Sequence, residues 1–139
     1  MKCVVVLVFS IMILTFYGCN LAPGSYPYAE IYQINVPADS LIIVIEEWKE
    51  NNTQYKLPLE IPFRDGLRDS SDLWYHIYLY NSNKDQVIKT WVRPKDQTST
   101  HFALIAIYDN NEWKFINKDF DNKKNKEVKN EFEEDVLMP

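Results

Sequence analysis

The residues best suited to chemistry in this 139-residue sequence lie in three stretches between Leu73 and Tyr108. Each stretch alternates in character, and alternate side chains of a strand point to opposite faces of a sheet. One consistent arrangement gathers aromatic and basic side chains on a single face: His76, Tyr78, Tyr80, Lys89, Trp91, Arg93 and Tyr108. Aromatic rings with polar tips beside Arg are typical of protein interfaces and sugar sites. The alternative is that this face is the second side of the core, covered by a helix or by residues 55–72.

The remaining polar residues point less clearly to a reaction. A zinc site needs three or four nearby ligands, whereas the two histidines, His76 and His101, are far apart in sequence and neither belongs to an HExxH motif. Ser99, His101 and Asp109 could be written as a triad, but the chain has no GxSxG motif. We therefore predict no metal, no cofactor and no assigned catalytic residue.

The elements that position these residues are predicted from periodicity and turn signals. Strands are expected over 73–80, 86–93 and 100–108, with a short fourth strand over 113–116. The polar segments 81–85, 95–99 and 109–111 separate them, which predicts an antiparallel meander.

Two helices and a first strand flank the meander. Residues 28–36 alternate as a strand does, and residues 38–51 carry Leu41, Ile45 and Trp48 at helical spacing. The β-branched run 42–45 would also suit a buried strand, but length and the charged second half favour a helix. Residues 122–137 predict a terminal helix whose first three charged residues are lysines and whose last four are acidic, which opposes the helix dipole at both ends. The fold class is therefore α+β: an antiparallel β-meander with an N-terminal strand-helix unit and a C-terminal helix packed mainly on one face.

The first nineteen residues suggest where the protein is located. Lys2 precedes an apolar run of 14 residues, Val4 to Tyr17, followed by Gly18 and Cys19. A membrane-spanning helix needs about 20 apolar residues, so the run suits a secretory signal peptide better. The Leu14–Cys19 segment resembles a bacterial lipoprotein signal with the relaxed lipobox common in Bacteroidota: Gly18 and Cys19 match, Phe16 and Tyr17 are bulkier than usual, and Leu14 lies two places early.

That resemblance implies cleavage before Cys19 and acylation of Cys19, with ordinary signal-peptidase cleavage as the alternative. Residues 1–18 would be the signal peptide, 19–27 a lipid-anchored tether broken by Pro23 and Pro27, and 28–139 a single α+β domain. Several acyl chains give stable anchoring. The expected location is the cell envelope, at the outer membrane of a Gram-negative bacterium.

Composition narrows the function further. Cys3 and Cys19 are the only cysteines, so a cleaved and acylated chain has no free thiol for catalysis or a disulfide. Removing the signal leaves 14 basic and 20 acidic residues, a formal net charge of −6, which argues against a nucleic-acid partner. We therefore favour a non-catalytic binding module, such as an accessory subunit of an envelope complex or an immunity-type protein, that contacts a protein or a glycan. A small glycan-acting or hydrolytic enzyme is the alternative.

Overall fold

The computed structural model describes residues 26–138, and the predicted signal peptide, Cys19 and most of the predicted tether lie outside these residues. Within residues 26–138, five strands and two α-helices form an α+β fold, as predicted. The strands are β1 (Glu30–Ile34), β2 (Tyr75–Asn81), β3 (Gln86–Pro94), β4 (Thr100–Asp109) and β5 (Glu112–Phe115). The helical elements are α2 (Ala38–Asn51), a 3₁₀ turn η2 (Thr53–Tyr55), α3 (Asn122–Phe132) and a π-helical turn η3 (Glu133–Leu137).

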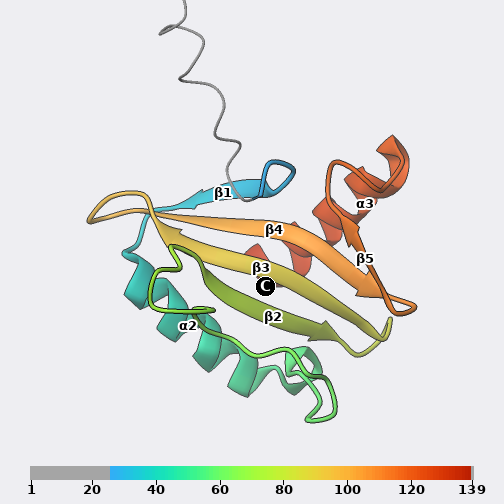
Figure 1. Cartoon of the computed structure of the whole chain (residues 1–139), viewed down its shortest axis with the longest axis horizontal. Coiled ribbons are helices and arrows are strands. Elements are labelled where there is room, and N and C mark those ends of the chain that lie inside the picture. Colours follow the sequence, from blue (N-terminus) through green and yellow to red (C-terminus); the bar gives the residue numbers. More distant parts are fainter. Residues whose placement is uncertain (1–25, 139) are drawn as a thin grey trace, which may run out of the picture.

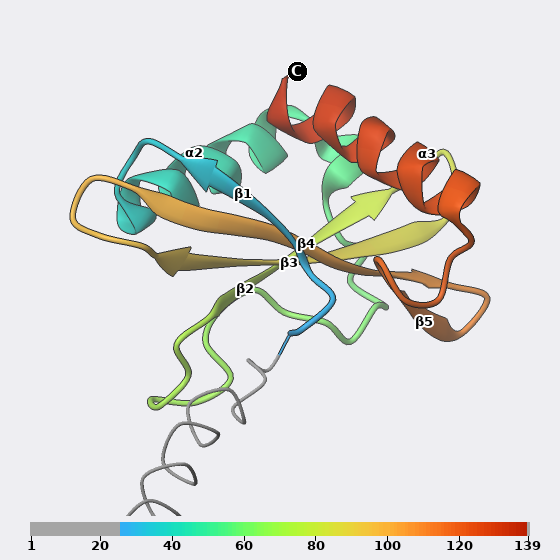
Figure 2. The same ribbon diagram turned by 90° about the horizontal axis from the view of Figure 1, so that it is seen from above.

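The strands form one antiparallel sheet in the order β1-β4-β3-β2, and β5 also pairs with β4. The meander β2-β3-β4-β5 (Figure 1) is the predicted one. Both helices cover the same face of the sheet, and the long segment between η2 and β2 crosses the opposite face (Figure 2). The β1-α2 unit and the terminal helix thus occupy the predicted positions.

Helix α2 follows its apolar spacing. Leu41 and Ile45 are buried with Ala38, and Trp48 packs against the same core. Two residues of its β-branched run, Ile43 and Val44, point outward and are exposed. Tertiary packing of the apolar stripe therefore decides this segment in favour of a helix.

The main core lies between the helices and the sheet. It contains aliphatic side chains of β2 and β3, Phe102 and Leu104 of β4, and Phe132 of α3. A second, smaller cluster lies on the other face of the sheet and centres on Trp91, Ala103, Ile105 and Ala106. The sheet is therefore buried on both faces along its middle strands.

A bulge in β4 changes which of its side chains face the helices. Strict alternation along the strand would place Ala103 and Ile105 with Ile107 on the helix side. Lys89 pairs with Ala106 and Thr90 pairs with Leu104, so Ile105 is an extra residue. An extra residue reverses the alternation on one side of the bulge. Phe102 and Leu104 therefore face the helices, and Ala103 and Ile105 face away.

The turns carry the residues that their geometry requires. Asn110 and Asn111 connect β4 to β5, and both have positive φ angles, 50° and 64°. Two positive φ angles in a two-residue hairpin loop define a type I′ turn, which Asn tolerates well. In the β3-β4 turn, the Asp96 carboxylate accepts hydrogen bonds from the backbone N–H groups of Thr98 and Ser99, both at 2.8 Å.

The outer edge of β2 is closed by residues that precede it. Gly66, at a φ of 130°, exchanges two backbone hydrogen bonds of 2.9 Å with His76. Asp65 accepts a hydrogen bond from the Tyr78 N–H, and the Lys49 ammonium donates to the Tyr78 carbonyl. These contacts occupy groups that an exposed edge strand would offer to another chain.

Helix α3 begins at a cap that offsets its unfavourable charge order. The Asp121 carboxylate accepts a hydrogen bond of 2.8 Å from the Lys124 N–H. Asn125 is hydrogen-bonded to Asn117, which ties the first turn to the preceding loop. At the other end, the Tyr32 hydroxyl donates to Glu133 at 3.1 Å. Hydrogen bonds therefore hold the helical segment at both ends.

Candidate functional site

The seven predicted face residues share one side of the sheet but differ widely in exposure. His76 and Trp91 are buried, with 2% and 4% of their surface exposed. Tyr78, Tyr80, Lys89 and Tyr108 are partly exposed, and Arg93 is exposed. The structure therefore does not present these residues as one open binding surface.

Other aromatic rings cover the face. Tyr26 packs over Trp74, His76 and Trp91, with ring centroids 5.6, 6.0 and 6.3 Å away. Phe63 stacks on Tyr78 at 5.2 Å and contacts Trp113 at 5.1 Å. Tyr26 belongs to the predicted tether and Phe63 to the 55–72 connection, so segments outside the sheet complete a second aromatic layer. The centre of the face, His76 and Trp91, is thus covered by Tyr26 and not by a helix or by residues 55–72, whereas Phe63 of the 55–72 connection covers Tyr78.

Three cations lie against this layer. Lys89 lies 5.7 Å from the Tyr26 ring and 5.6 Å from the Trp113 ring. Arg93 lies 5.2 Å from the Trp74 ring, and Arg68 lies 6.0 Å from Tyr26. Burial lowers the pKa of Lys89, and the charge of Arg68 lowers it further. The cations therefore hold the rings by cation–π attraction at the rim of the layer.

His76 is paired with a carboxylate, but the pair closes a loop. Its Nε2 lies 3.1 Å from Asp72 Oδ2, and Asp72 also accepts hydrogen bonds from the N–H groups of Trp74 and Arg68. Burial lowers the pKa of His76, and Arg68 lowers it further against the opposing effect of Asp72. The folded protein therefore favours the neutral His76 ring. As the pH falls below about 6.5, His76 becomes protonated in the unfolded state first, and the free energy of unfolding decreases.

The triad drawn from sequence does not form. The Ser99 hydroxyl donates to Asp96 Oδ2 at 2.6 Å. Asp109 lies at the opposite end of β4 from His101, and eight residues of strand extend about 27 Å. Among residues 26–138, no group of three or more His, Cys, Asp and Glu side chains is arranged to hold a metal ion.

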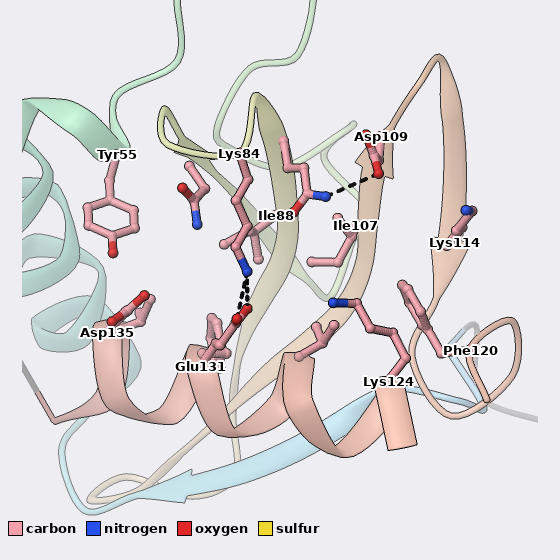
Figure 3. Close-up of a pocket in the computed structure, with 15 residues that line it drawn as sticks. Tyr55, Lys84, Ile88, Ile107, Asp109, Lys114, Phe120, Lys124, Glu131 and Asp135 are labelled. Carbon is pink, nitrogen blue, oxygen red and sulfur yellow. Dashed lines mark hydrogen bonds and ion pairs between the residues drawn. The ribbon is translucent and has the colours of Figure 1, made fainter. Parts of the chain in front are cut away.

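A cavity of about 270 Å³ lies on the helix side of the sheet, between α3 and strands β3 and β4 (Figure 3). We call it the α3 cavity. Its apolar lining comes from two sides: Ile88 and Ile107 of the sheet face Val128, Phe132 and Val136 of α3 and η3, and Phe120 lies at one end. The apolar stripe of the terminal helix therefore leaves space above the sheet that no side chain of the described residues fills.

Charged side chains form the rim of the α3 cavity. Lys84, from the β2-β3 turn, reaches across the mouth and donates to Glu131 Oε1 at 2.6 Å (Figure 3). Gln86 donates to Asp109 at 3.1 Å on the same side. Lys84 thus compensates the charge of Glu131, whose i, i+4 neighbour Asp135 carries the same charge.

Tyr55 and Asp135 lie together at the far end of the cavity (Figure 3). Burial raises the pKa of Tyr55, and the Asp135 carboxylate raises it further. The lining holds Lys84, Lys114 and Lys124 against Asp109, Glu131 and Asp135, so its charges balance. The cavity therefore suits an apolar group that is flanked by charged groups of either sign.

Sequence reasoning missed the α3 cavity as a site. The helical stripe of Val128, Phe132 and Val136 predicted docking on the sheet, and periodicity carries no information on how closely two elements pack. No protein family, curated protein or solved structure matches this chain. Within residues 26–138, no helix is both long enough and apolar enough to cross a membrane.

Proposed function

We propose that this protein is a lipid-anchored, non-catalytic binding module of the bacterial envelope, held at the outer membrane through Cys19. Its binding site is the α3 cavity, and its partner is a protein that inserts an aromatic or aliphatic side chain there. The observation that carries the proposal is the cavity itself, a space with an apolar floor between one helix and the sheet, with an ion pair of partly exposed side chains at its rim.

The size of the cavity fits one anchor residue. An apolar cavity of about 150 Å³ accommodates a benzene ring, so about 270 Å³ leaves room for a large aromatic side chain. Protein interfaces obtain much of their affinity from such anchors in well-packed pockets. The cavity is smaller than most small-molecule sites, which begin at about 300 Å³, so a single side chain is the better fit.

The rim supplies specificity for the residues beside the anchor. Lys84 and Glu131 are bound to each other, and their side chains are 39% and 41% exposed. An exposed pair of this kind contributes little to stability, so a partner can replace it at small cost. An anchor residue flanked by opposite charges would satisfy both groups.

The experiment is capture of envelope proteins by the membrane-anchored wild type and by Val128→Trp, which fills the cavity from the helix side. The matched control is Val44→Trp, on the exposed side of α2. We expect a partner that is retained by the wild type and by Val44→Trp and is lost with Val128→Trp. Capture that is unchanged by Val128→Trp, in a variant that melts at the wild-type temperature, contradicts the site.

One observation favours the alternative of a small hydrolytic or glycan-acting enzyme. The Asp72–His76 pair has the geometry of an oriented base, at 3.1 Å. Its ring is buried beneath Tyr26, so a substrate would first have to displace Tyr26. Hydrolysis of envelope glycans that disappears in His76→Gln would favour this alternative.

A further inference from the structure

A compact turn projects from the face of the sheet opposite the helices, on the side where the described chain begins. We call residues 66–73 the leucine turn. Its base is fixed by the two hydrogen bonds between Gly66 and His76. Its interior is closed by Asp72, which accepts from the Arg68 N–H at 3.2 Å, and by Asp69, which accepts from the Ser71 N–H at 2.8 Å.

Two leucines at the ends of this turn are exposed. Leu67 has 53% and Leu73 has 58% of its surface accessible. A rigid loop that holds two large apolar side chains away from the core loses the free energy of burying them, unless another surface covers them. The leucine turn therefore has the form of a docking element.

The charged residues around the turn favour an anionic surface. Two of the nearby carboxylates are engaged inside the protein, Asp65 with Lys49 and Asp72 with His76, and the exposed Asp69 accepts a hydrogen bond from Ser71 within the turn. Arg68 and Arg93 are exposed and lie against the rings of Tyr26 and Trp74, and within residues 26–138 neither forms an ion pair. Their guanidinium groups remain available to phosphate oxygens.

The position of the N-terminal segment indicates what covers the leucine turn. Tyr26 packs beside Trp74, directly after the turn, and contacts Arg68. Cys19 precedes Tyr26 by seven residues, which extend at most about 25 Å. An acyl anchor on Cys19 therefore holds this face, and not the helix face, close to the bilayer surface.

From this arrangement we propose that the leucine turn inserts Leu67 and Leu73 into the membrane interface while Arg68 and Arg93 bind anionic lipid headgroups. This orients the domain with the helices and the α3 cavity away from the bilayer (Figure 2). The proposal rests on the proposed lipid anchor, and it goes further by naming the surface that meets the lipid. Apolar insertion combined with charge attraction is the usual basis of interfacial binding.

The test uses the full lipoprotein in vesicles of phosphatidylethanolamine and phosphatidylglycerol. Leu67→Cys and Leu73→Cys each introduce one labelling site, since Cys3 leaves with the signal and Cys19 is acylated. The matched control is Val44→Cys on α2, which has the same 58% exposure as Leu73. Each thiol carries an environment-sensitive fluorophore.

We expect a blue shift and quenching by doxyl-labelled lipid at positions 67 and 73, and quenching by aqueous iodide at position 44. Arg68→Gln with Arg93→Gln, or vesicles without phosphatidylglycerol, should reduce the shift. If labels at positions 44 and 73 are equally accessible to iodide in protein that floats with the vesicles, the inference is wrong. Protection of position 73 in native membranes but not in pure vesicles also contradicts it and indicates a protein occupant.

Failure of the lipid anchor gives a different result, because the protein then does not float with vesicles. In that case a hexahistidine tag replacing residues 1–19 tethers the domain to a nickel-chelating lipid. The same labels then test the orientation without acylation.

Discussion

At the scale of single residues, the aromatic layer shows why residue type alone did not separate an interface from a core. Trp91 is of a residue type common among interface anchors, but only 4% of its surface is exposed because Tyr26 covers it. Arg93, two residues further along β3, lies at the rim over Trp74. The two residues share a face and have different roles.

Replacement of these two residues should therefore have unequal effects on stability. Trp91→Ala removes a buried ring and should lower the free energy of unfolding by about 3–5 kcal/mol. Arg93→Ala removes one exposed cation–π contact and should cost about 0.5–1 kcal/mol. Urea unfolding followed by circular dichroism measures both, and a Trp91→Ala loss no larger than that of Arg93→Ala would show that the second cluster is not a core.

At the scale of elements, α3 depends on contacts outside its own sequence. Its first three charged residues, Lys123, Lys124 and Lys126, are basic, so the charges at its start oppose the dipole. Asp121 caps the first turn, Lys84 pairs with Glu131, and Phe132 is buried in the main core. The helix that bounds the α3 cavity is thus held mainly at its ends.

The cap is the simplest of these contacts to remove. Asp121→Ala should destabilise the protein by about 1 kcal/mol and raise the hydrogen-exchange rates of α3 amides more than those of β3 or β4. Asn122→Ala, one position later, removes no side-chain hydrogen bond seen in the described residues and serves as control. Equal exchange in both variants would mean that the cap does not limit α3.

At the scale of the whole molecule, the two faces of the sheet have different environments in our proposals. The helix face carries the α3 cavity, and the opposite face carries Tyr26 and the leucine turn. An N-terminal lipid on the second face leaves the first accessible to a partner. Anchor and binding site then lie on opposite sides of a single domain.

Acylation itself has a direct measurement. The wild type should incorporate labelled palmitate, and its mature N-terminus should be Cys19 with the mass of its acyl chains. Cys19→Ala should lose the label, whereas Cys3→Ala, which changes the cysteine inside the signal, should keep it. A mature wild type with an unmodified thiol would instead indicate ordinary signal-peptidase cleavage.

The sequence by itself determined the elements and their order. Period-two and helical patterns, the turn residues Asn110 and Asn111, and the stripe of Leu41 and Ile45 are local signals, and the structure confirms each of them. Tertiary structure alone decided three other properties: the reversed faces in β4, the burial of His76 and Trp91, and the α3 cavity. Each of these depends on contacts between segments far apart in the chain, such as Tyr26 with Trp91 or Lys84 with Glu131. Local periodicity does not determine the distance at which such segments pack against each other.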